Sequence, residues 1–336
     1  MFNFLLFSAI VVAAIGAGYF LNKNKEDYSF FSFDHTTILR GIAILLVVWG
    51  HVGKENNIGS IQFIAGAGVS LFLICSGYGL EMSYKKNGLK DFWKKRIVGV
   101  IVPFYVISLA GYVINSLFIY RFSNLSLSGF LNILDFNSQW YISYLLICYV
   151  IYYFITRFIK DYKKKMFALI AAFCVWFIID SLFFVSADAP FLRARQMGAF
   201  ISGIVIAENR ERSEKIIGKV WFLIPNLIGG VALTALSNLR VVKSLPIIVS
   251  NVLSLGTVVP LAFAVISASL LVKKAFLNKS LLFAGVISYE IFLVHSYSLK
   301  LTSREWYWVL FFFVFVTILS WALNCIWKKA KKKLIH

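Results

Sequence analysis

Arg40 and His51 stand eleven residues apart in one long apolar segment, and they are the side chains of this chain best suited to chemistry. An ionisable group inside a membrane-length hydrophobic stretch is costly and by default marks a functional site. At about 100° per residue, this spacing makes three helical turns plus roughly 20°, so both side chains point the same way. They lie about 16 Å apart along the axis, roughly half the hydrocarbon core of a bilayer. The spacing predicts a polar path across the membrane.

The two side chains suit different tasks. Arg40 can anchor an anion, and His51 can act as a general base, because an imidazole titrates near neutrality and accepts a hydroxyl proton. The structural alternative is that Arg40 snorkels to the interface while His51 hydrogen-bonds a neighbouring helix. We favour the functional interpretation, because both groups share one face of the same helix.

His295 is a second imidazole in an apolar run, and Ser288, two turns earlier, shares its helical face. Glu290 in the same run points elsewhere and needs a partner or a proton. His295 is predicted either to orient His51 or to bind an acceptor. A plain interhelical hydrogen bond is an equal alternative.

Basic residues near both ends of the apolar runs are further candidates. Lys94, Lys95 and Arg96 form a cluster suited to the phosphates of a nucleotide-bearing donor. The general excess of Lys and Arg in cytoplasmic loops explains the same cluster. Arg193 and Arg195 can polarise a reacting carbonyl or bind an acceptor sugar, although arginines are common at membrane interfaces.

Three other residues have a structural and a functional interpretation. Trp140 opens an apolar run where an aromatic belt is expected, and stacking on a sugar is the alternative. Asp180 is an intramembrane acid to which the sequence assigns no partner. His35, next to Asp34 at the boundary of an apolar run, is predicted to be solvated.

Composition identifies an integral membrane protein. Of the 336 residues, 60% are hydrophobic and 15% charged, whereas a soluble domain carries about 25% charged residues. No segment is hydrophilic enough to form a separate soluble domain, so residues 1–336 are expected to form one membrane domain. The net charge of +19 lies in short loops between apolar runs, so we expect no nucleic-acid partner. The four cysteines lack paired or zinc-like spacing, and no metal is expected.

Eleven apolar runs have lengths near the 17 to 25 residues that a crossing helix needs. They are residues 3–21, 36–53, 61–80, 97–120, 137–159, 166–186, 190–207, 219–237, 245–272, 281–299 and 307–327. The first lacks a preceding basic region, so we expect a retained helix rather than a cleaved signal peptide. Gly256 and Pro260 favour a kink in the ninth run.

The distribution of basic residues predicts the orientation. With the C-terminal lysines in the cytoplasm, cytoplasmic loops hold 25 Lys and Arg and outer loops hold 8. Arg40, inside an apolar run, completes the total of 34. This excess places the C-terminus in the cytoplasm and the N-terminus outside, in a multi-pass protein of the cell membrane. Arg40 then lies near the cytoplasmic face, and both His51 and His295 lie near the outer face.

Taken in order, these motifs resemble the integral-membrane acyltransferase-3 family over about residues 34–327. Its mark, an Arg or Lys followed by ten residues and a His in one helix, is matched by Arg40 and His51. The other matches are a Phe-rich stretch ending in Ser76, Gly77 and Tyr78; Lys94, Lys95 and Arg96 before Pro103; Arg195 before Phe200 and Gly203; and Ser288, Ile291, Phe292, Leu293 and His295.

The resemblance implies an all-α, polytopic transmembrane helical bundle of ten core helices with a central pore or cleft. Residues 1–21 would be an extra N-terminal helix, residues 34–327 the core, and residues 328–336 a basic cytoplasmic tail. It also implies transfer of an acyl group, commonly acetyl, from cytoplasmic acyl-CoA to a hydroxyl of an extracytoplasmic glycan or lipid-linked sugar. Acetyl-CoA is then the expected donor. The chain would act alone, as a homo-oligomer, or with a separate extracytoplasmic partner.

The resemblance also assigns expected roles. The catalytic residues would be His51, Arg40, His295 and Arg195; the donor-binding residues Arg40, Ser76, Tyr78, Lys94, Lys95 and Arg96; and the acceptor-binding residues Arg193, Trp140 and His295. The competing class is a carrier of a glycan, lipid or small anion, since intramembrane ionisable groups also suit ion and proton relays. Against a carrier, we find no inverted repeat in the sequence.

Overall fold

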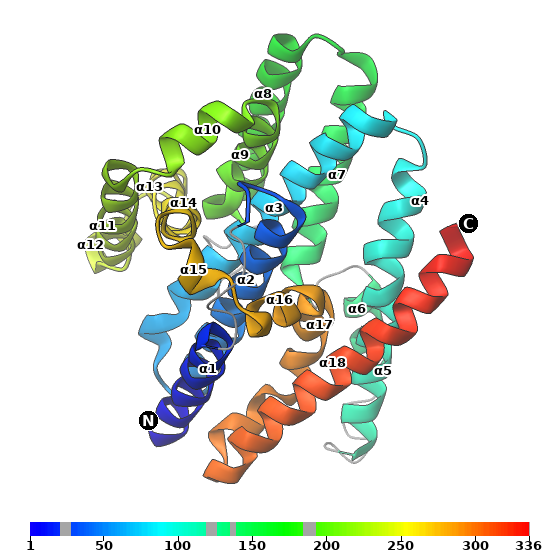
Figure 1. Cartoon of the computed structure of the whole chain (residues 1–336), viewed down its shortest axis with the longest axis vertical. Coiled ribbons are helices and arrows are strands. Elements are labelled where there is room, and N and C mark those ends of the chain that lie inside the picture. The colour runs from blue at the N-terminus through cyan, green and yellow to red at the C-terminus, as the bar shows by residue number, and fades with distance from the viewer. Residues whose placement is uncertain (21–27, 119–125, 135–138, 184–192, 336) are drawn as a thin grey trace.

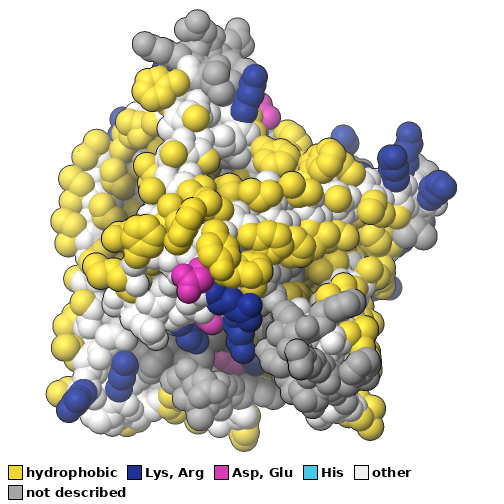
Figure 2. All heavy atoms as spheres, turned by 90° about the horizontal axis from the view of Figure 1, so that it is seen from below, with side chains coloured by type: hydrophobic (Ala, Val, Ile, Leu, Met, Phe, Trp, Pro, Cys, Tyr) yellow, Lys and Arg dark blue, Asp and Glu magenta, His cyan; other side chains and the backbone are white. Residues whose placement is uncertain are grey.

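The computed structural model describes residues 1–20, 28–118, 126–134, 139–183 and 193–335 (Figure 1). These residues form eighteen α-helices, and the described ranges contain no strand. Hydrocarbon offers no hydrogen bonds, so a chain in a bilayer must satisfy its backbone internally, as helices do. The predicted all-α polytopic bundle is therefore confirmed. Hydrophobic side chains cover much of the face in Figure 2, where Lys and Arg stand in separate groups.

Nine helical segments of the described chain are long and apolar enough to cross a membrane, and a tenth span results if one bent pair is counted together. The nine are α1 (Phe2–Phe20), α2 (Phe33–Glu55), α3 (Phe63–Asn87) with its leading turn Gly59–Gln62, α4 (Phe92–Arg96) with α5 (Val102–Phe118), α7 (Trp140–Phe158), α8 (Tyr162–Phe183), α11 (Val220–Ser237), α13 (Ile247–Leu255) with α14 (Val258–Leu271), and α18 (Trp306–Ile335). The helix is interrupted where the kink is predicted, because α13 ends at Leu255 and α14 begins at Val258, although the two together still count as one span.

The bent pair is α16 (Lys279–Val286) and α17 (Ser288–Ser298), which meet at an angle of 77°. The sequence predicts one span over residues 281–299, and the structure breaks it at Ile287. The remaining short helices are α6 (Leu127–Leu134), α9 (Met197–Glu208), α10 (Arg210–Ile217), α12 (Arg240–Lys243) and α15 (Lys273–Phe276).

The run predicted to cross at residues 190–207 is shorter than expected. Its first three residues lie outside the described ranges, and α9 has 12 residues, or about 18 Å, against roughly 30 Å of hydrocarbon. A 3-10 turn, Ala194–Gln196, precedes the helix, and Gln196 is fully buried. Arg195 in this turn therefore enters the helical bundle instead of ending a full span at the outer surface.

Two close helix crossings hold the core. A Cβ on Gly77 of α3 would overlap the Phe200 carbonyl of α9, and one on Gly203 would overlap the Ile74 carbonyl. Glycine here lets the two backbones approach, as is common between membrane helices. The Ser76–Tyr78 motif and the Phe200–Gly203 motif are thus the two sides of one contact.

The second crossing joins α2 and α16. A Cβ on Gly41 would overlap the Leu281 carbonyl, and one on Gly285 would overlap the Thr37 carbonyl. This contact fixes α17, which follows α16 after the bend, beside the C-terminal half of α2.

The two terminal helices lie side by side at the edge of the bundle (Figure 1). Most residues of α1 are not buried, so the helix presents apolar side chains to the surroundings, as a retained membrane helix does. α18 continues to Ile335, so residues 328–335 of the predicted basic tail prolong this helix.

Candidate active site

The structure brings the two predicted intramembrane histidines together. Nδ1 of His51 in α2 lies 2.9 Å from Nε2 of His295 in α17, and the ring planes differ by 7°. His295 Nδ1 lies 3.0 Å from the Ile291 carbonyl oxygen. His295 is buried and His51 is half-buried.

These contacts determine where the hydrogens lie when both rings are neutral. A carbonyl oxygen only accepts, so His295 Nδ1 carries a hydrogen and donates it to Ile291. His295 Nε2 is then an acceptor, so His51 Nδ1 must donate to it. The remaining lone pair is on His51 Nε2, which is therefore the atom able to take a proton.

A cavity of about 370 Å³ lies beside Arg40. Three residues of the expected donor site, Arg40, Ser76 and Tyr78, line it. The other lining residues are mostly aromatic or apolar: Phe31, Phe33, Thr36, Phe72, Cys75, Gly79, Val100, Tyr141, Leu145, Tyr149, Ser288, Tyr289 and Phe292. The volume is within the usual range of small-molecule pockets, about 300 to 1,000 Å³.

Among the described residues, the Arg40 guanidinium hydrogen-bonds within its own helix. Its Nε donates to the Thr36 carbonyl at 3.2 Å, and Nη2 donates to the Thr37 hydroxyl at 3.3 Å. The ion pairs of the described residues give it no carboxylate partner. Its charge is thus available to an anion in the cavity.

Arg96 of the predicted basic cluster contacts the cavity wall. Its guanidinium carbon lies 5.4 Å from the ring centroid of Tyr149, and the Tyr149 hydroxyl lies 3.0 Å from Ser76 Oγ. Lys94 is exposed on α4, and Lys95 donates to the Lys90 carbonyl at 3.4 Å. Neither lysine lines the cavity.

The predicted polar path from Arg40 to His51 is interrupted. The lining of the Arg40 cavity includes neither histidine. Phe292, which lines the cavity, lies with its ring centroid 5.9 Å from that of His295, and Tyr141 packs edge-on against Phe292 at 5.0 Å. Aromatic side chains therefore separate the two ends of the expected path in this structure.

Arg195 lies against α3, next to the crossing of α3 with α2. Its guanidinium carbon is 3.5 Å from the point that a Cβ on Gly66 would occupy, and Gly50 packs against Ala65 at the same α2–α3 crossing. Gly66 follows Ala65 in the chain, and His51 follows Gly50. Arg195 and His51 are therefore both next to the Gly50–Ala65 contact between α2 and α3. Arg195 Nε is buried without a hydrogen-bond partner, and the ion pairs of the described chain do not include Arg195.

Polar residues around Arg195 are well satisfied. Gln196 Nε2 donates to the Gly66 carbonyl at 3.0 Å, and Gln196 Oε1 accepts from Ser70 Oγ at 2.6 Å. These bonds attach the turn before α9 to α3. They explain how a chain segment that is not helical is tolerated inside the bundle.

The contacts of Arg193 and Trp140 are with residues other than the histidine pair. Arg193 Nη1 lies 3.2 Å from Asp180 Oδ1, so Asp180 has the partner that sequence analysis does not identify. Trp140 opens α7 half-buried and packs edge-on against Tyr141. Glu290 also has a partner, because its Oε1 accepts from Asn324 Nδ2 at 2.9 Å.

The prediction of a solvated His35 is wrong, because residues 28–32 cover it and it is fully buried. Its Nδ1 accepts from the Phe31 amide at 2.9 Å, its Nε2 lies 2.9 Å from Ser269 Oγ, and Tyr28 stacks on its ring. Phe31 has a left-handed φ of 47°, which is rare for a bulky residue. His35 thereby holds Phe31 in the cavity wall, where the ring centroid of Phe31 lies 4.6 Å from that of Tyr78.

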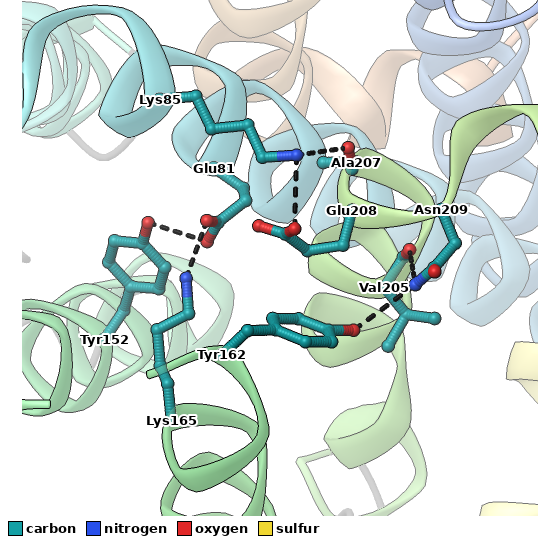
Figure 3. Close-up of polar contacts among 9 residues, drawn as sticks. All are labelled: Glu81, Lys85, Tyr152, Tyr162, Lys165, Val205, Ala207, Glu208 and Asn209. Carbon is teal, nitrogen blue, oxygen red and sulfur yellow. Dashed lines mark hydrogen bonds and ion pairs between the residues drawn. The ribbon is translucent and has the colours of Figure 1, made fainter. Parts of the chain in front are cut away.

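Sequence analysis does not identify a buried ion pair between α3 and α8 (Figure 3). Lys165 Nζ lies 2.6 Å from Glu81 Oε1, and the Tyr152 hydroxyl donates to Glu81 Oε2 at 2.8 Å. Phe92 stacks on Tyr152, and Arg96 lies over Phe92. The signal in the sequence is the position of Glu81, three residues beyond Tyr78 and directly after the apolar run 61–80.

The described residues form a helical bundle with membrane-length apolar helices, a cavity beside Arg40, and an internal histidine pair. The Acyl_transf_3 acyltransferase-domain model matches residues 32–325, and the chain belongs to this family. It is thus a membrane acyltransferase by family. No curated protein matches the chain, and no solved structure matches it. α1 lies before the matched range.

Proposed function

We propose that this chain is a membrane O-acyltransferase. It moves an acyl group, which we expect to be acetyl, from cytoplasmic acyl-CoA to a hydroxyl of an extracytoplasmic or lipid-linked glycan. The observation that carries the proposal is the hydrogen-bond chain from His51 through His295 to the Ile291 carbonyl. That chain leaves a basic nitrogen on the helix that also carries Arg40, and family membership supports the acyl chemistry.

The donor enters the Arg40 cavity in this proposal. Arg40 has no carboxylate partner among the described residues, and Arg96 lies behind Tyr149 on the same wall. The two cations suit the phosphates of CoA, with Lys94 and Lys95 adding charge nearby. Ser76 and Tyr78 contribute hydroxyls to the cavity. The side chains of Phe292 and Tyr141 must move apart for the thioester to reach His51.

The transfer step is general-base catalysis. His51 Nε2 takes the proton of the acceptor hydroxyl as that oxygen attacks the thioester carbonyl. Arg195 stabilises the oxyanion of the tetrahedral intermediate, and collapse breaks the carbon–sulfur bond. The CoA thiolate then takes the proton from His51. Throughout, His295 Nε2 accepts from His51 Nδ1 and so favours the imidazolium that forms.

The proposed orientation puts the C-terminus in the cytoplasm and the N-terminus outside. The excess of Lys and Arg in one set of loops supports it. Donor and base then lie toward opposite faces of the membrane. Trp140 and Arg193 would contact the acceptor from the outer side, with the Arg193 charge shared with Asp180.

Two variants test the proposal in membrane vesicles supplied with labelled acetyl-CoA and a glycan acceptor. Arg40→Ala should raise KM for acetyl-CoA by about tenfold with kcat largely retained, because it removes one charge-assisted contact. His51→Ala should lower kcat by about 10²- to 10⁴-fold, because it removes the base. Arg240→Ala, an exposed arginine on α12, is the matched control. Wild-type kcat in His51→Ala would sink the assignment.

The competing function is that of a carrier without transfer activity. The 77° break between α16 and α17 is one feature of the described chain that transporters share, but their sites use a pair of broken helices. Purified protein that releases free CoA thiol from acetyl-CoA supports the enzyme. A carrier would leave the thioester intact.

A further inference from the structure

A second cavity, of about 220 Å³, lies between α1 and the core. Its walls come from α1, α2, α16, α17 and α18, and fourteen of its sixteen lining residues are apolar; Ser280 and Thr317 are the exceptions. Apolar cavities of this kind stay dry and take apolar ligands; one of about 150 Å³ binds benzene. At membrane depth, the ligand available to such a space is a hydrocarbon chain.

One end of the cavity adjoins a basic segment. Ser280 lines the cavity, Lys279 precedes it, and Lys273 and Lys274 open the short helix α15 just before. Residues 273–280 contain three lysines and no acid. Lys274 and Lys279 are exposed, and Lys273 is partly buried. Basic clusters at the cytoplasmic surface attract anionic lipid headgroups.

Asn278 adds an unused polar group at the same end. Its Oδ1 accepts from the Leu281 amide and caps α16, whereas its buried Nδ2 has no hydrogen-bond partner among the residues that the structure describes. The residue is 1% exposed and lies against Gly18 near the end of α1. A buried donor of this kind is normally satisfied, and a phosphate or ester oxygen of a lipid would satisfy it.

We propose that α1 and the core together bind one anionic phospholipid of the cytoplasmic leaflet. One acyl chain fills the cavity, and the phosphate lies at Lys273, Lys274 and Lys279. The charge of the segment selects an anionic lipid over a zwitterionic one with the same chains. Because α1 precedes the range matched by the family, this site belongs to the added helix.

The lipid also packs behind the histidine pair, and this consequence rests on the proposed function. Val48 and Ile291 line the cavity; Val48 is three residues before His51, and the Ile291 carbonyl accepts from His295. A chain in the cavity would restrict the movement of both helices, so transfer activity should rise with anionic lipid.

The binding test does not depend on activity. Full-length protein, depleted of lipid by detergent exchange, is incubated with dioleoyl phosphatidylglycerol or dioleoyl phosphatidylcholine, and retained lipid is counted by native mass spectrometry. Wild-type protein should retain one phosphatidylglycerol with roughly tenfold preference. Replacing Lys273, Lys274 and Lys279 by Ala should remove the preference, since lysines near a membrane surface attract anionic headgroups. The same triple change at Lys329, Lys332 and Lys333 of α18 is the control and should keep it.

Ala14→Phe separates chain binding from charge. Ala14 lines the cavity from α1, so a phenyl ring should fill the space and lower retention of both lipids. Its folding is checked by thermal stability without added lipid. Equal retention of the two lipids by wild type, unchanged retention in Ala14→Phe, or an isoprenoid lipid copurifying in place of phospholipid would each overturn the proposal. If wild-type protein retained phosphatidylglycerol but transferred no acyl group, the proposed enzyme function would be wrong and the lipid site would stand.

Discussion

Lys165 and Arg195 are both cations inside the helical bundle, but their surroundings differ. Lys165 lies 2.6 Å from the Glu81 carboxylate, and both side chains are less than 5% exposed. Arg195 forms no ion pair among the described residues, and its buried Nε has no partner. An unpaired buried charge is costly to keep. We infer from this contrast that Lys165 serves the fold, and we propose that Arg195 serves the substrate.

The same division separates Arg193 from Arg40. Arg193 is paired with Asp180 at 3.2 Å, whereas Arg40 donates only to its own helix. Both unpaired arginines are also the ones matched by motifs of the family. Pairing in three dimensions therefore separates cations that look alike in sequence, and three sets of variants test this division.

Lys165→Met should give the largest change in stability. It leaves the Glu81 carboxylate buried without its partner, and breaking a buried ion pair in this way costs about 3 to 5 kcal/mol of unfolding free energy. The double variant Glu81→Gln, Lys165→Met should recover most of the loss, because no buried charge remains. The measurement is denaturant unfolding in mild detergent.

Lys85→Met is the matched control for this pair. Lys85 contacts Glu208 at 3.2 Å on the same side of α3 (Figure 3), but its side chain is 39% exposed. Exposed ion pairs contribute about 0 to 1 kcal/mol. If Lys165→Met and Lys85→Met were equally stable, burial would not distinguish the two pairs.

Arg195→Gln should affect catalysis more than stability. On the proposed mechanism it removes an oxyanion donor, a change that typically lowers kcat by about 10²- to 10³-fold. Its thermal stability should match that of wild type, since no carboxylate loses a partner. Arg193→Gln should show the reverse pattern, because it leaves Asp180 unpaired. Both quantities are measured on the same preparations, and a larger loss of kcat in Arg193→Gln would reverse the assignments.

The parts of the site visible in sequence are those carried by one helix. Arg40 and His51 share α2, so helical periodicity alone predicts their alignment. The sequence does not predict an ion pair at Glu81, because this residue directly follows an apolar run, where a charged residue is typical of the start of a loop. Its partner Lys165 is 84 residues away, and no local pattern reports that contact.

Other features depend on breaks in helices, which hydropathy does not show. The contact between His51 and His295 needs the bend at Ile287, and the depth of Arg195 follows from the short α9. The π-helical turn Ile97–Ile101 follows the basic cluster directly, and it is Arg96, the residue next to the turn, that contacts Tyr149. Side-chain packing likewise determines that Phe292 and Tyr141 interrupt the expected path.

Tyr149→Phe should give the smallest effect and test the cavity wall shared by Ser76 and Arg96. The change keeps the ring beneath the Arg96 guanidinium but removes the hydroxyl, 3.0 Å from Ser76 Oγ. One hydrogen bond contributes about 0.5 to 1.5 kcal/mol, so KM for acetyl-CoA should rise roughly two- to tenfold while kcat changes little. Tyr153→Phe is the control, because the Tyr153 hydroxyl accepts from Arg157 at an exposed position. If both variants shift KM equally, the donor does not bind in the Arg40 cavity. A shift of KM confined to Tyr149→Phe supports donor binding in this cavity, beside the unpaired Arg40.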